Sequence, residues 1–308
     1  MMLREKRILI TGGAGFIGSN IVEALSPSND ITILDNLRSG KRENLQGDYT
    51  FIEGDILDIS ELESKDFDAV LHLAAMASVE DSFNNPAECI RINTEGTAKV
   101  LEFCRKNGID RFVFTSTAAL YGNDPVLPKK EDMKQEILSP YAASKDASER
   151  LVKIYADVYG LKAYNMRLFN AFGPRQDPKS PYSGVISIFV ERALRDETIY
   201  INGDGSNTRD FVYVKDIVNA FICATQGKDK FGSTINIATN TETRVDDLAK
   251  MLITKLDSKS DIVYREPRVG DVYRSYADNT LARKILGWEP NYSVDEGLNL
   301  YLEWLKSN

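Results

Sequence analysis

Short apolar runs alternate with stretches of helical periodicity along the first 170 residues. Each run ends at polar residues or glycines, and we predict that each forms a β-strand. Helices are expected over residues 19–25, 90–107 and 141–159. This alternation is typical of an α/β fold with a parallel, doubly wound sheet of the Rossmann type. The predicted strands cover residues 8–10, 31–34, 50–56, 68–75, 111–117 and 163–170.

The pattern becomes irregular after Gly173 and Pro174, where turn signals become frequent. We therefore expect two domains, a Rossmann domain over residues 1–173 and a smaller α/β domain formed mainly by residues 174–308. Segment 210–238 contains two strand-like runs that we expect to return to the first sheet. The boundary is therefore not a single point in the sequence.

Four glycines lie between the first apolar run and the first predicted helix, and three of them are spaced three residues apart. Strand, glycine turn and helix in this order predict a dinucleotide site, although Gly-x-x-Gly-x-x-Gly departs from the common Gly-x-Gly-x-x-Gly. Gly12 permits the tight turn, Gly15 lets backbone approach a pyrophosphate, and Gly18 lets the helix pack on the strand. The next strand ends at Asp35, about 20 residues further on, where a carboxylate binds ribose hydroxyls and repels a 2′-phosphate. We therefore predict NAD as cofactor, with Arg38 close enough to soften the preference over NADP.

Tyr141 and Lys145 stand four residues apart, just after Pro140. On a helix this spacing places both side chains on one face. A phenol that exchanges a proton near neutral pH needs a pKa below its usual value of about 10, and an adjacent ammonium favours the phenolate. We therefore expect an acid/base pair in which Lys145 lowers the pKa of Tyr141. An aromatic core residue beside a solvated lysine is the alternative interpretation of the same spacing.

Composition narrows the class of protein and of partner. The chain has 308 residues, 43% of them hydrophobic, so it can bury a large core. Its net charge of −8 argues against nucleic acid or an anionic membrane surface as a partner. No run reaches the length of a membrane-spanning helix, and residues 1–6 lack the apolar core of a signal peptide. We therefore expect a cytoplasmic protein.

The cysteines and the histidine indicate neither a metal site nor a triad. Cys89, Cys104 and Cys223 are widely spaced in apolar or helical surroundings, and we interpret them as buried free thiols. His72, the only histidine, lies inside an apolar run and is interpreted as a satisfied strand residue. Zinc coordination or a Ser-His-Asp triad therefore has little to be built from.

Several short motifs occur together in one order. With them the chain resembles the extended short-chain dehydrogenase/reductase family. Within that family it is similar to the nucleotide-sugar 4-epimerases that act on UDP-glucose or UDP-N-acetylglucosamine. The resemblance covers essentially the whole chain. The motifs span residues 11–18, 35–37, 54–56, 72–75, 116–122, 141–145, 167–170, 209–211 and 268–271.

The resemblance implies that the NAD site extends well beyond the glycine turn. Asp55 and Ile56 are implied near the adenine, although Asp55 could simply cap a turn. Asn93 is implied at the cofactor, although it could cap a helix. The implied cofactor-binding residues are Gly12, Gly15, Phe16, Ile17, Gly18, Asp35, Asn36, Asp55, Ile56, Leu73, Ala74, Ala75, Asn93, Thr115, Tyr141 and Lys145.

The resemblance also implies that Thr117, Tyr141 and Lys145 are catalytic, with the Thr117 hydroxyl aimed at the sugar oxygen that is oxidised. Arg209 and Arg268 suit a diphosphate, because guanidinium groups bind phosphate in two-point geometry. Surface salt bridges are the alternative for the arginines, and packing is the alternative for Thr117. The implied substrate-binding residues are Ser78, Thr117, Tyr141, Asn170, Arg209, Arg268, Asp271 and Ser275.

These parts imply epimerisation of a UDP-hexose by transient oxidation at carbon 4. The small side chain of Ser275 stands where related enzymes restricted to UDP-glucose and UDP-galactose hold a tyrosine, so an N-acetyl group is expected to fit. A homodimer is expected through helices 90–107 and 141–159, with Val100, Leu101, Leu151 and Ile154 buried between subunits.

Other functions of the same fold stay open on the sequence. UDP-glucuronate epimerases, sugar-nucleotide 4,6-dehydratases and glucuronate decarboxylases share the tyrosine-lysine pair. The dehydratases resemble Thr-Asp-Glu, and many decarboxylases carry Glu, where this chain has Ala118 and Ala119. Simple sugar reduction with free cofactor exchange is another alternative. A non-catalytic NAD-sensing protein is the alternative of a different class, and the intact Thr117, Tyr141 and Lys145 argue against it.

Overall fold

Seven parallel strands form the central sheet of the chain, which is described here from a computed structural model that covers residues 3–62, 66–177, 184–267 and 272–307. The strand order is β11-β6-β5-β4-β1-β2-β3. This order reverses direction at β1, as in a doubly wound sheet, and confirms the predicted α/β Rossmann-type fold. The strands are β1 (Arg7–Thr11), β2 (Asp30–Asp35), β3 (Thr50–Glu53), β4 (Ala69–His72), β5 (Arg111–Thr117), β6 (Lys162–Leu168) and β11 (Thr234–Ile237).

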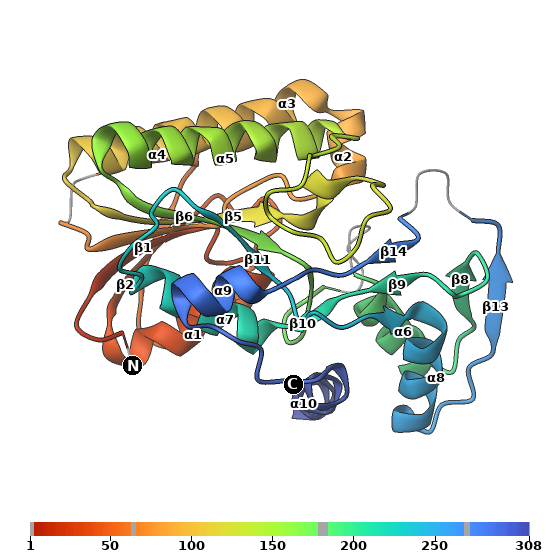
Figure 1. Cartoon of the computed structure of the whole chain (residues 1–308). Helices are drawn as coiled ribbons and strands as arrows, with labels where there is room; N and C mark the ends of the chain where they lie inside the picture. Colours follow the sequence, from red (N-terminus) through yellow and green to blue (C-terminus); the bar gives the residue numbers. More distant parts are fainter. Residues whose placement is uncertain (1–2, 63–65, 178–183, 268–271, 308) are drawn as a thin grey trace.

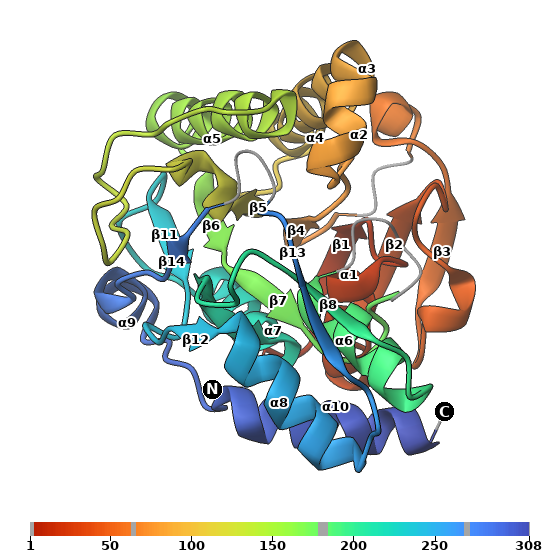
Figure 2. The same cartoon turned by 90° about the vertical axis from the view of Figure 1, so that its right-hand side faces the viewer.

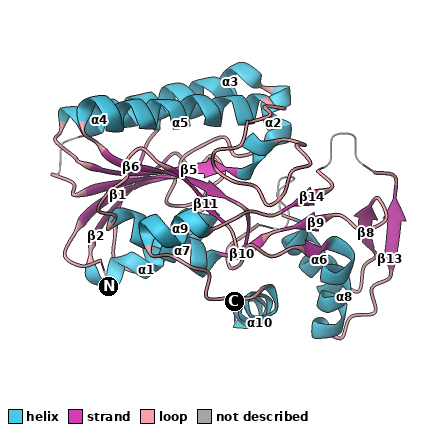
Figure 3. Cartoon of the chain, viewed as in Figure 1, coloured by secondary structure: helices cyan, strands magenta, loops and turns pink. Residues whose placement is uncertain are grey.

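Helices cover both faces of this sheet (Figures 1 and 3). Because both faces are covered, the inner strands are largely buried, and β4 is buried at every residue. Separate hydrophobic clusters fill the two sides of the sheet. One side carries α1 (Phe16–Leu25), α7 (Val214–Thr225) and α9 (Thr280–Leu286). The other carries α2 (Val79–Asn84), α3 (Pro86–Ile90), α4 (Gly96–Lys106) and α5 (Pro140–Tyr159).

The helix predicted over residues 90–107 is interrupted in the structure. A π-helical turn, Arg91–Glu95, separates α3 from α4. Within that turn the Asn93 carbonyl accepts hydrogen bonds from the hydroxyls of Thr97 and Ser148. Such wide turns occur often at functional sites. The strand predicted over 50–56 is also shorter, because Asp55 accepts a bond from the Leu57 N–H and caps a 3₁₀ helix, Ile56–Glu61.

The remaining elements gather beyond the carboxyl ends of the strands (Figure 2). Short sheets and three helices enclose a third hydrophobic cluster there. The sheets pair β8 (Ile199–Asn202) with β13 (Ile262–Arg265), β7 (Asn170–Phe172) with β10 (Phe211–Tyr213), and β9 (Thr208–Arg209) with both β12 (Thr243–Arg244) and β14 (Arg274–Ser275). The helices are α6 (Val185–Leu194), α8 (Val245–Leu256) and α10 (Val294–Ser307).

The two strand-like runs expected in segment 210–238 have different positions. β11 pairs with β6 and extends the central sheet. β10 pairs with β7 in a separate two-stranded sheet, so this run does not return to the central sheet. The division into domains at residue 173 stays a prediction.

Two residues expected at a subunit interface lie inside the chain. Val100 and Leu101 are fully buried in the core between α4 and the sheet, so their placement at an interface was wrong. Leu151 is partly buried against the same core, whereas Ile154 is 49% exposed. The helical pattern alone did not distinguish the face of α4 that packs on its own sheet from a face available to a partner.

Candidate functional site

The glycine turn between β1 and α1 leaves no room for a side chain at two of the three glycines of the predicted motif. A Cβ on Gly12, where φ is +72°, would lie 2.6 Å from the backbone nitrogen of Ala74. A Cβ on Gly18 would lie 2.3 Å from the carbonyl oxygen of Gly12. Gly15 is more open, since its Cβ would meet only that oxygen, at 3.3 Å. Phe16 and Ile17 begin α1 without a capping side chain, so the helix N-terminus keeps donors for an anion.

Asp35 ends β2 beside this turn. Its carboxylate accepts the N–H of Ala14 at 2.9 Å and the N–H of Leu37 at 2.8 Å. Asp35 is therefore held in place by backbone donors, with a negative charge where a cofactor 2′-phosphate would stand. The guanidinium of Arg38 pairs instead with Glu88, at 3.1 Å. This pairing favours the NAD prediction over NADP.

The implied adenine residues lie at the next strand. Asn36 donates a hydrogen bond to Asp55 at 2.9 Å. Ile56 is only 4% exposed, and its side chain packs against Gly96. Asp55 lines a cavity of about 440 Å³ with Leu34, Ile52 and Ile59 among its apolar walls. An apolar slot with a hydrogen-bonding rim suits a nucleobase.

A chain of hydrogen bonds fixes the floor of the site. The Thr11 hydroxyl lies 2.6 Å from Nδ1 of His72, and Nε2 of His72 lies 3.0 Å from the Thr97 hydroxyl. Since Thr97 donates its proton to the Asn93 carbonyl at 2.5 Å, its oxygen accepts the proton on Nε2. Burial lowers the pKa of His72 to about 3, so the ring is neutral. The interpretation of His72 as a satisfied strand residue is confirmed.

Leu73, Ala74 and Ala75 follow His72 at the end of β4. The Ala74 N–H lies 3.4 Å from the Thr11 hydroxyl, which places this segment against the glycine turn. Asn93 continues the floor, since it accepts the N–H of Met76 at 2.8 Å and donates to the Ser144 hydroxyl at 2.9 Å. Ser144 neighbours Lys145 on α5, so the floor joins the helix of the predicted acid/base pair.

The side chains of Thr117, Tyr141 and Lys145 converge at the carboxyl end of β5. Lys145 donates to the Thr115 carbonyl at 2.8 Å, and its Nζ lies 4.8 Å from the centre of the Phe114 ring. The hydroxyl of Thr117 interacts with that of Tyr141 and accepts the N–H of Ala119 at 3.1 Å. The helix places the pair here because Ser139 caps it and Pro140 occupies its first turn.

The expectation that Lys145 lowers the pKa of Tyr141 was wrong for the protein alone. Burial raises the pKa of the Tyr141 phenol to about 12, and the Thr117 hydroxyl opposes this only in part. Burial also lowers the pKa of Lys145 to about 8. The structural reason is that the lysine nitrogen is directed at the Thr115 carbonyl and the Phe114 ring. One N–H of the ammonium is therefore bonded to the strand and not to the Tyr141 oxygen.

Three of the predicted substrate residues come together in the second group of elements. In the parallel pairing of β9 with β14, Ser275 stands opposite Arg209. Asn170 donates to the Asp210 carbonyl at 3.1 Å, which places it beside Arg209. A cavity of about 670 Å³, lined in part by Asn207 and Tyr273, lies next to these strands.

Of the other predicted substrate residues in this group, Ser78 lies among the described residues. Ser78 is buried and caps α2 through a 2.8 Å bond from the Asp81 N–H, so its hydroxyl has a structural partner. Arg268 and Asp271 lie outside the described residues.

The site has the features that an NAD molecule requires. The glycine turn is shaped so that side chains are excluded, an open helix N-terminus follows, and a carboxylate ends the next strand. The Thr115 hydroxyl is buried without a hydrogen-bond partner among the described residues. A buried hydroxyl of this kind is a candidate for a ligand contact.

Comparisons with known proteins agree with this geometry. Residues 8–238 match the NAD dependent epimerase/dehydratase family, and the chain belongs to that family. A curated relative from Mycolicibacterium smegmatis, UDP-glucose 4-epimerase, is 36% identical over 98% of this chain and 99% of its own length. These matches confirm the resemblance drawn from the motifs.

Two solved structures share the whole fold. UDP-N-acetylglucosamine 4-epimerase from Methanobrevibacter ruminantium, solved with UDP-N-acetylmuramic acid, has a TM-score of 0.94 at 37% identity and covers 99% of both chains. UDP-glucose 4-epimerase from Thermotoga maritima, solved with UDP-glucose, has a TM-score of 0.92 at 40% identity, covering 98% of this chain and 99% of its own. Within the described residues, no helix combines the length and apolarity needed to cross a membrane.

Proposed function

We propose that the protein is an NAD-dependent 4-epimerase of UDP-hexoses that interconverts UDP-glucose and UDP-galactose through a 4-keto sugar. One observation carries the proposal: α5 brings Tyr141 and Lys145 to Thr117 at the carboxyl edge of the sheet that also holds the glycine turn. Ligands bind at this edge in doubly wound folds. The names and ligands of the similar proteins support the substrate class.

The proposed proton chemistry follows from the Tyr141 environment. With its pKa raised to about 12, the phenol is protonated at neutral pH in the protein alone. It is therefore suited to protonate the oxygen of a 4-keto sugar, and it needs nearby positive charge to accept the 4-hydroxyl proton in the reverse step. Bound NAD supplies the hydride acceptor and donor for carbon 4. The Thr117 hydroxyl is positioned to hold the reacting oxygen.

Inversion at carbon 4 requires the keto sugar to present its opposite face. The nucleotide must stay bound while the sugar turns, so we assign the anchoring role to Arg209 and Arg268 and further nucleotide contacts to Asn170 and Asp271. The placement of Arg209 on a strand in register with Ser275 supports this assignment. Guanidinium groups provide the two-point geometry that a diphosphate needs.

Elimination or decarboxylation is less well supported. The position after Thr117 carries Ala118 and Ala119, which begin a short 3₁₀ helix with no acidic side chain. Water elimination at carbon 6 needs an acid and a base beyond the tyrosine. This chain therefore lacks, beside Thr117, the acidic side chain that distinguishes the dehydratases and many decarboxylases.

We further propose that N-acetylated UDP-hexoses are accepted. Ser275 is a small residue on β14, and a tyrosine there would occupy the space around the sugar 2-substituent. The similarity to a UDP-N-acetylglucosamine 4-epimerase supports this breadth.

We also propose that the protein is a homodimer and is cytoplasmic. The α4 and α5 pair retains exposed apolar side chains on α5, at Ile154, Val158 and Tyr159. Such residues on neighbouring helices suit a four-helix interface with a second copy. The absence of paired cysteines among Cys89, Cys104 and Cys223 supports a reducing compartment.

A substrate panel tests the function. Purified protein is assayed with UDP-galactose, UDP-N-acetylgalactosamine and UDP-glucuronate, and products are identified by chromatography. We expect turnover of the first two and acid-released NAD in the protein. No interconversion of any of them by protein that retains NAD would refute the epimerase assignment.

The same panel applied to Ser275→Tyr tests the proposed breadth. We expect this variant to lose kcat/KM for the acetylated sugar by roughly 10-fold or more while keeping UDP-galactose, because a close-packed site cannot absorb the added ring. Ser275→Ala is the matched control and should keep both activities. Equal loss on both sugars in Ser275→Tyr would return Ser275 to a general packing role.

A further inference from the structure

Glu149 lies on the helix face that carries the proposed acid/base pair. Tyr141, Lys145 and Glu149 follow one another at intervals of four residues along α5, so their side chains share one side of the helix. All three residues are buried, with 5% of Glu149 exposed. A buried carboxylate needs partners, since its desolvation is otherwise unfavourable by several kcal/mol.

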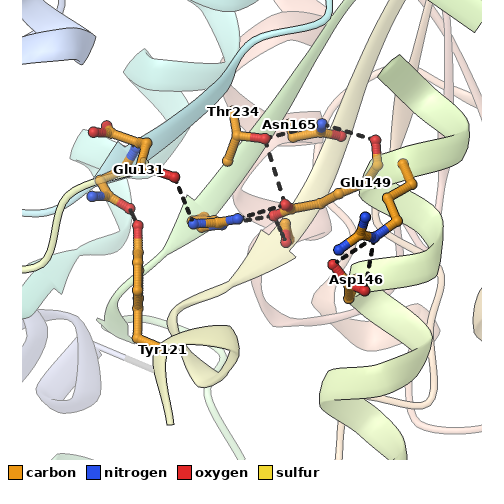
Figure 4. A network of polar contacts seen from close by, with 10 residues as sticks. Tyr121, Glu131, Asp146, Glu149, Asn165 and Thr234 are labelled. Atoms are coloured by element: carbon orange, nitrogen blue, oxygen red, sulfur yellow. Dashed lines mark hydrogen bonds and ion pairs between the residues drawn. The ribbon is translucent and has the colours of Figure 1, made fainter. Parts of the chain in front are cut away.

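Donors from three strands surround the Glu149 carboxylate (Figure 4). From β6, Arg167 donates to Oε1 at 2.9 Å through Nε and to Oε2 at 2.8 Å through Nη2. From β5, the Ser116 hydroxyl donates to Oε1 at 2.5 Å. From β11, Thr234 lies 3.5 Å from Oε2. The carboxylate therefore fixes the third turn of α5 against the strand that ends at Thr117.

Arg167 is as buried as its partner. Its side chain is 3% exposed, and its guanidinium lies 4.9 Å from the centre of the Tyr121 ring. Buried ion pairs often contribute no more stability than apolar side chains of similar volume. A gain in stability alone therefore does not explain why a buried ion pair stands here. Its position, one helical turn beyond Lys145, indicates a role at the candidate site.

The titratable groups around Lys145 come from three elements. On α3, the Cys89 thiol lies in the same buried region; its thiolate would favour the protonated lysine, but burial raises the pKa of the thiol and so keeps it neutral. On β4, His72 is neutral. On α5 itself, Tyr141 is a neutral phenol and Glu149 is the carboxylate whose charge favours the protonated lysine. The bidentate pairing with Arg167 partly offsets that charge.

We propose that Glu149 is a positioning residue for the Tyr141–Lys145 pair. Its hydrogen bonds with Ser116 and Arg167 determine how α5 packs on β5. Its buried negative charge favours the ammonium form of Lys145. Arg167 limits that charge. The role in catalysis rests on the proposed function, whereas the effect on the Lys145 proton does not.

Neutralising one partner of the pair at a time gives the test its sign. Glu149→Gln removes the negative charge and leaves Arg167 unbalanced, so the Lys145 proton should be lost at a pH lower by about one unit. Arg167→Met leaves the carboxylate unbalanced, so the proton should be lost at a higher pH. The double variant restores neutrality and should titrate close to the wild type. Asp157→Asn is the matched control, because it removes one charge from an exposed pair on the same helix.

Two readouts separate this inference from the function. The Lys145 titration is followed by NMR of protein with isotope-labelled lysine, with the signal assigned from Lys145→Arg. The alkaline limb of kcat/KM for UDP-galactose is followed in parallel and should shift in the same directions, with KM changed less than kcat. Asp157→Asn should leave both unchanged.

Opposite shifts in the two single variants support the proposal even if the wild type proves inactive on every UDP-sugar. Shifts of the same sign, or none in properly folded variants, overturn it. If Glu149→Gln does not fold, Arg167→Met and the double variant still decide the sign. A normal alkaline limb alongside a shifted Lys145 titration would overturn the catalytic part alone.

Discussion

The hydroxyl groups of Thr117 and Tyr141 meet where β5 ends and α5 begins, and each is shaped by its backbone surroundings. Thr117 accepts the N–H of Ala119, so its proton stays available for another acceptor. Tyr141 is 9% exposed, which explains the raised pKa of its phenol. At neutral pH, Tyr141 is therefore a protonated phenol, and the Lys145 ammonium lies nearby.

Tyr141→Phe tests this arrangement. The variant loses the transferable proton and little volume, so we expect turnover to fall by roughly 10²- to 10⁴-fold while NAD remains bound. Thr117→Val should reduce turnover less, since it removes one hydrogen bond. Tyr159→Phe, an exposed tyrosine on the same helix, is the control. Near-normal epimerisation by Tyr141→Phe would exclude Tyr141 as the proton carrier.

Single residues were predictable where backbone geometry demanded a particular type. Gly12 and Gly18 were recognised because only glycine fits their contacts, and Asp35 because a carboxylate ends the adjoining strand. The pKa of Tyr141 was not predictable, since it depends on burial that the Tyr-x-x-x-Lys spacing does not encode. The only available signs of the Glu149–Arg167 pair were an arginine inside an apolar strand and a glutamate eight residues after Tyr141.

At the scale of elements, α5 has two working faces. One faces the sheet and carries the residues of the candidate site. The other exposes Ile154 and Val158, at 49% and 67%. The sequence predicted this helix almost to its ends because Ser139 and Gly160 cap it. The π-helical turn before α4 was not predicted, because it carries no sequence signal that separates it from an ordinary α-helical turn.

Val158→Glu tests the outer face. A charge placed in an apolar interface is unfavourable when the copies pair, so we expect the mass in solution to change from twice 34.5 kDa to 34.5 kDa. Light scattering at micromolar concentration measures this. Leu194→Glu, at an exposed position on α6, is the control and should remain a dimer. A wild-type protein that is already monomeric would contradict the dimer.

Across the whole molecule, Asp210 joins segments that are distant in sequence. Its carboxylate accepts the N–H of Thr239 at 2.8 Å, that of Asn240 at 3.0 Å and that of Ala277 at 3.4 Å. Thr239 follows the edge strand of the central sheet, whereas Ala277 follows β14. Burial raises the pKa of Asp210 to about 6. The connection between the sheet and the candidate substrate strands is therefore sensitive to pH.

Proton binding by Asp210 determines whether the free energy of unfolding rises or falls with pH. Folded Asp210 holds its proton to a higher pH than the unfolded chain, so its contribution to stability is largest below about pH 4 and declines as pH rises through 6. Asp210→Asn should therefore destabilise the protein by about 2 kcal/mol more at pH 4 than at pH 7. Urea unfolding at both values measures this. Asp204→Asn, where the pKa is lowered, should not share this trend. An equal loss at both pH values would contradict the raised pKa.

The segment that carries Ser275 is secured to the rest of the molecule through main-chain atoms. The Thr208 N–H donates to the Tyr273 carbonyl at 3.0 Å, the Lys129 N–H to the Tyr276 carbonyl at 2.9 Å, and the Asp278 N–H to the Lys129 carbonyl at 3.0 Å. Bonds of this kind do not depend on which side chain a position carries, glycine and proline aside. Mutation can therefore alter the side chain at position 275, which we propose lies next to the sugar, without loosening its support. A segment built in this way allows descendants of one ancestral enzyme to change substrate by single substitutions while keeping the same fold.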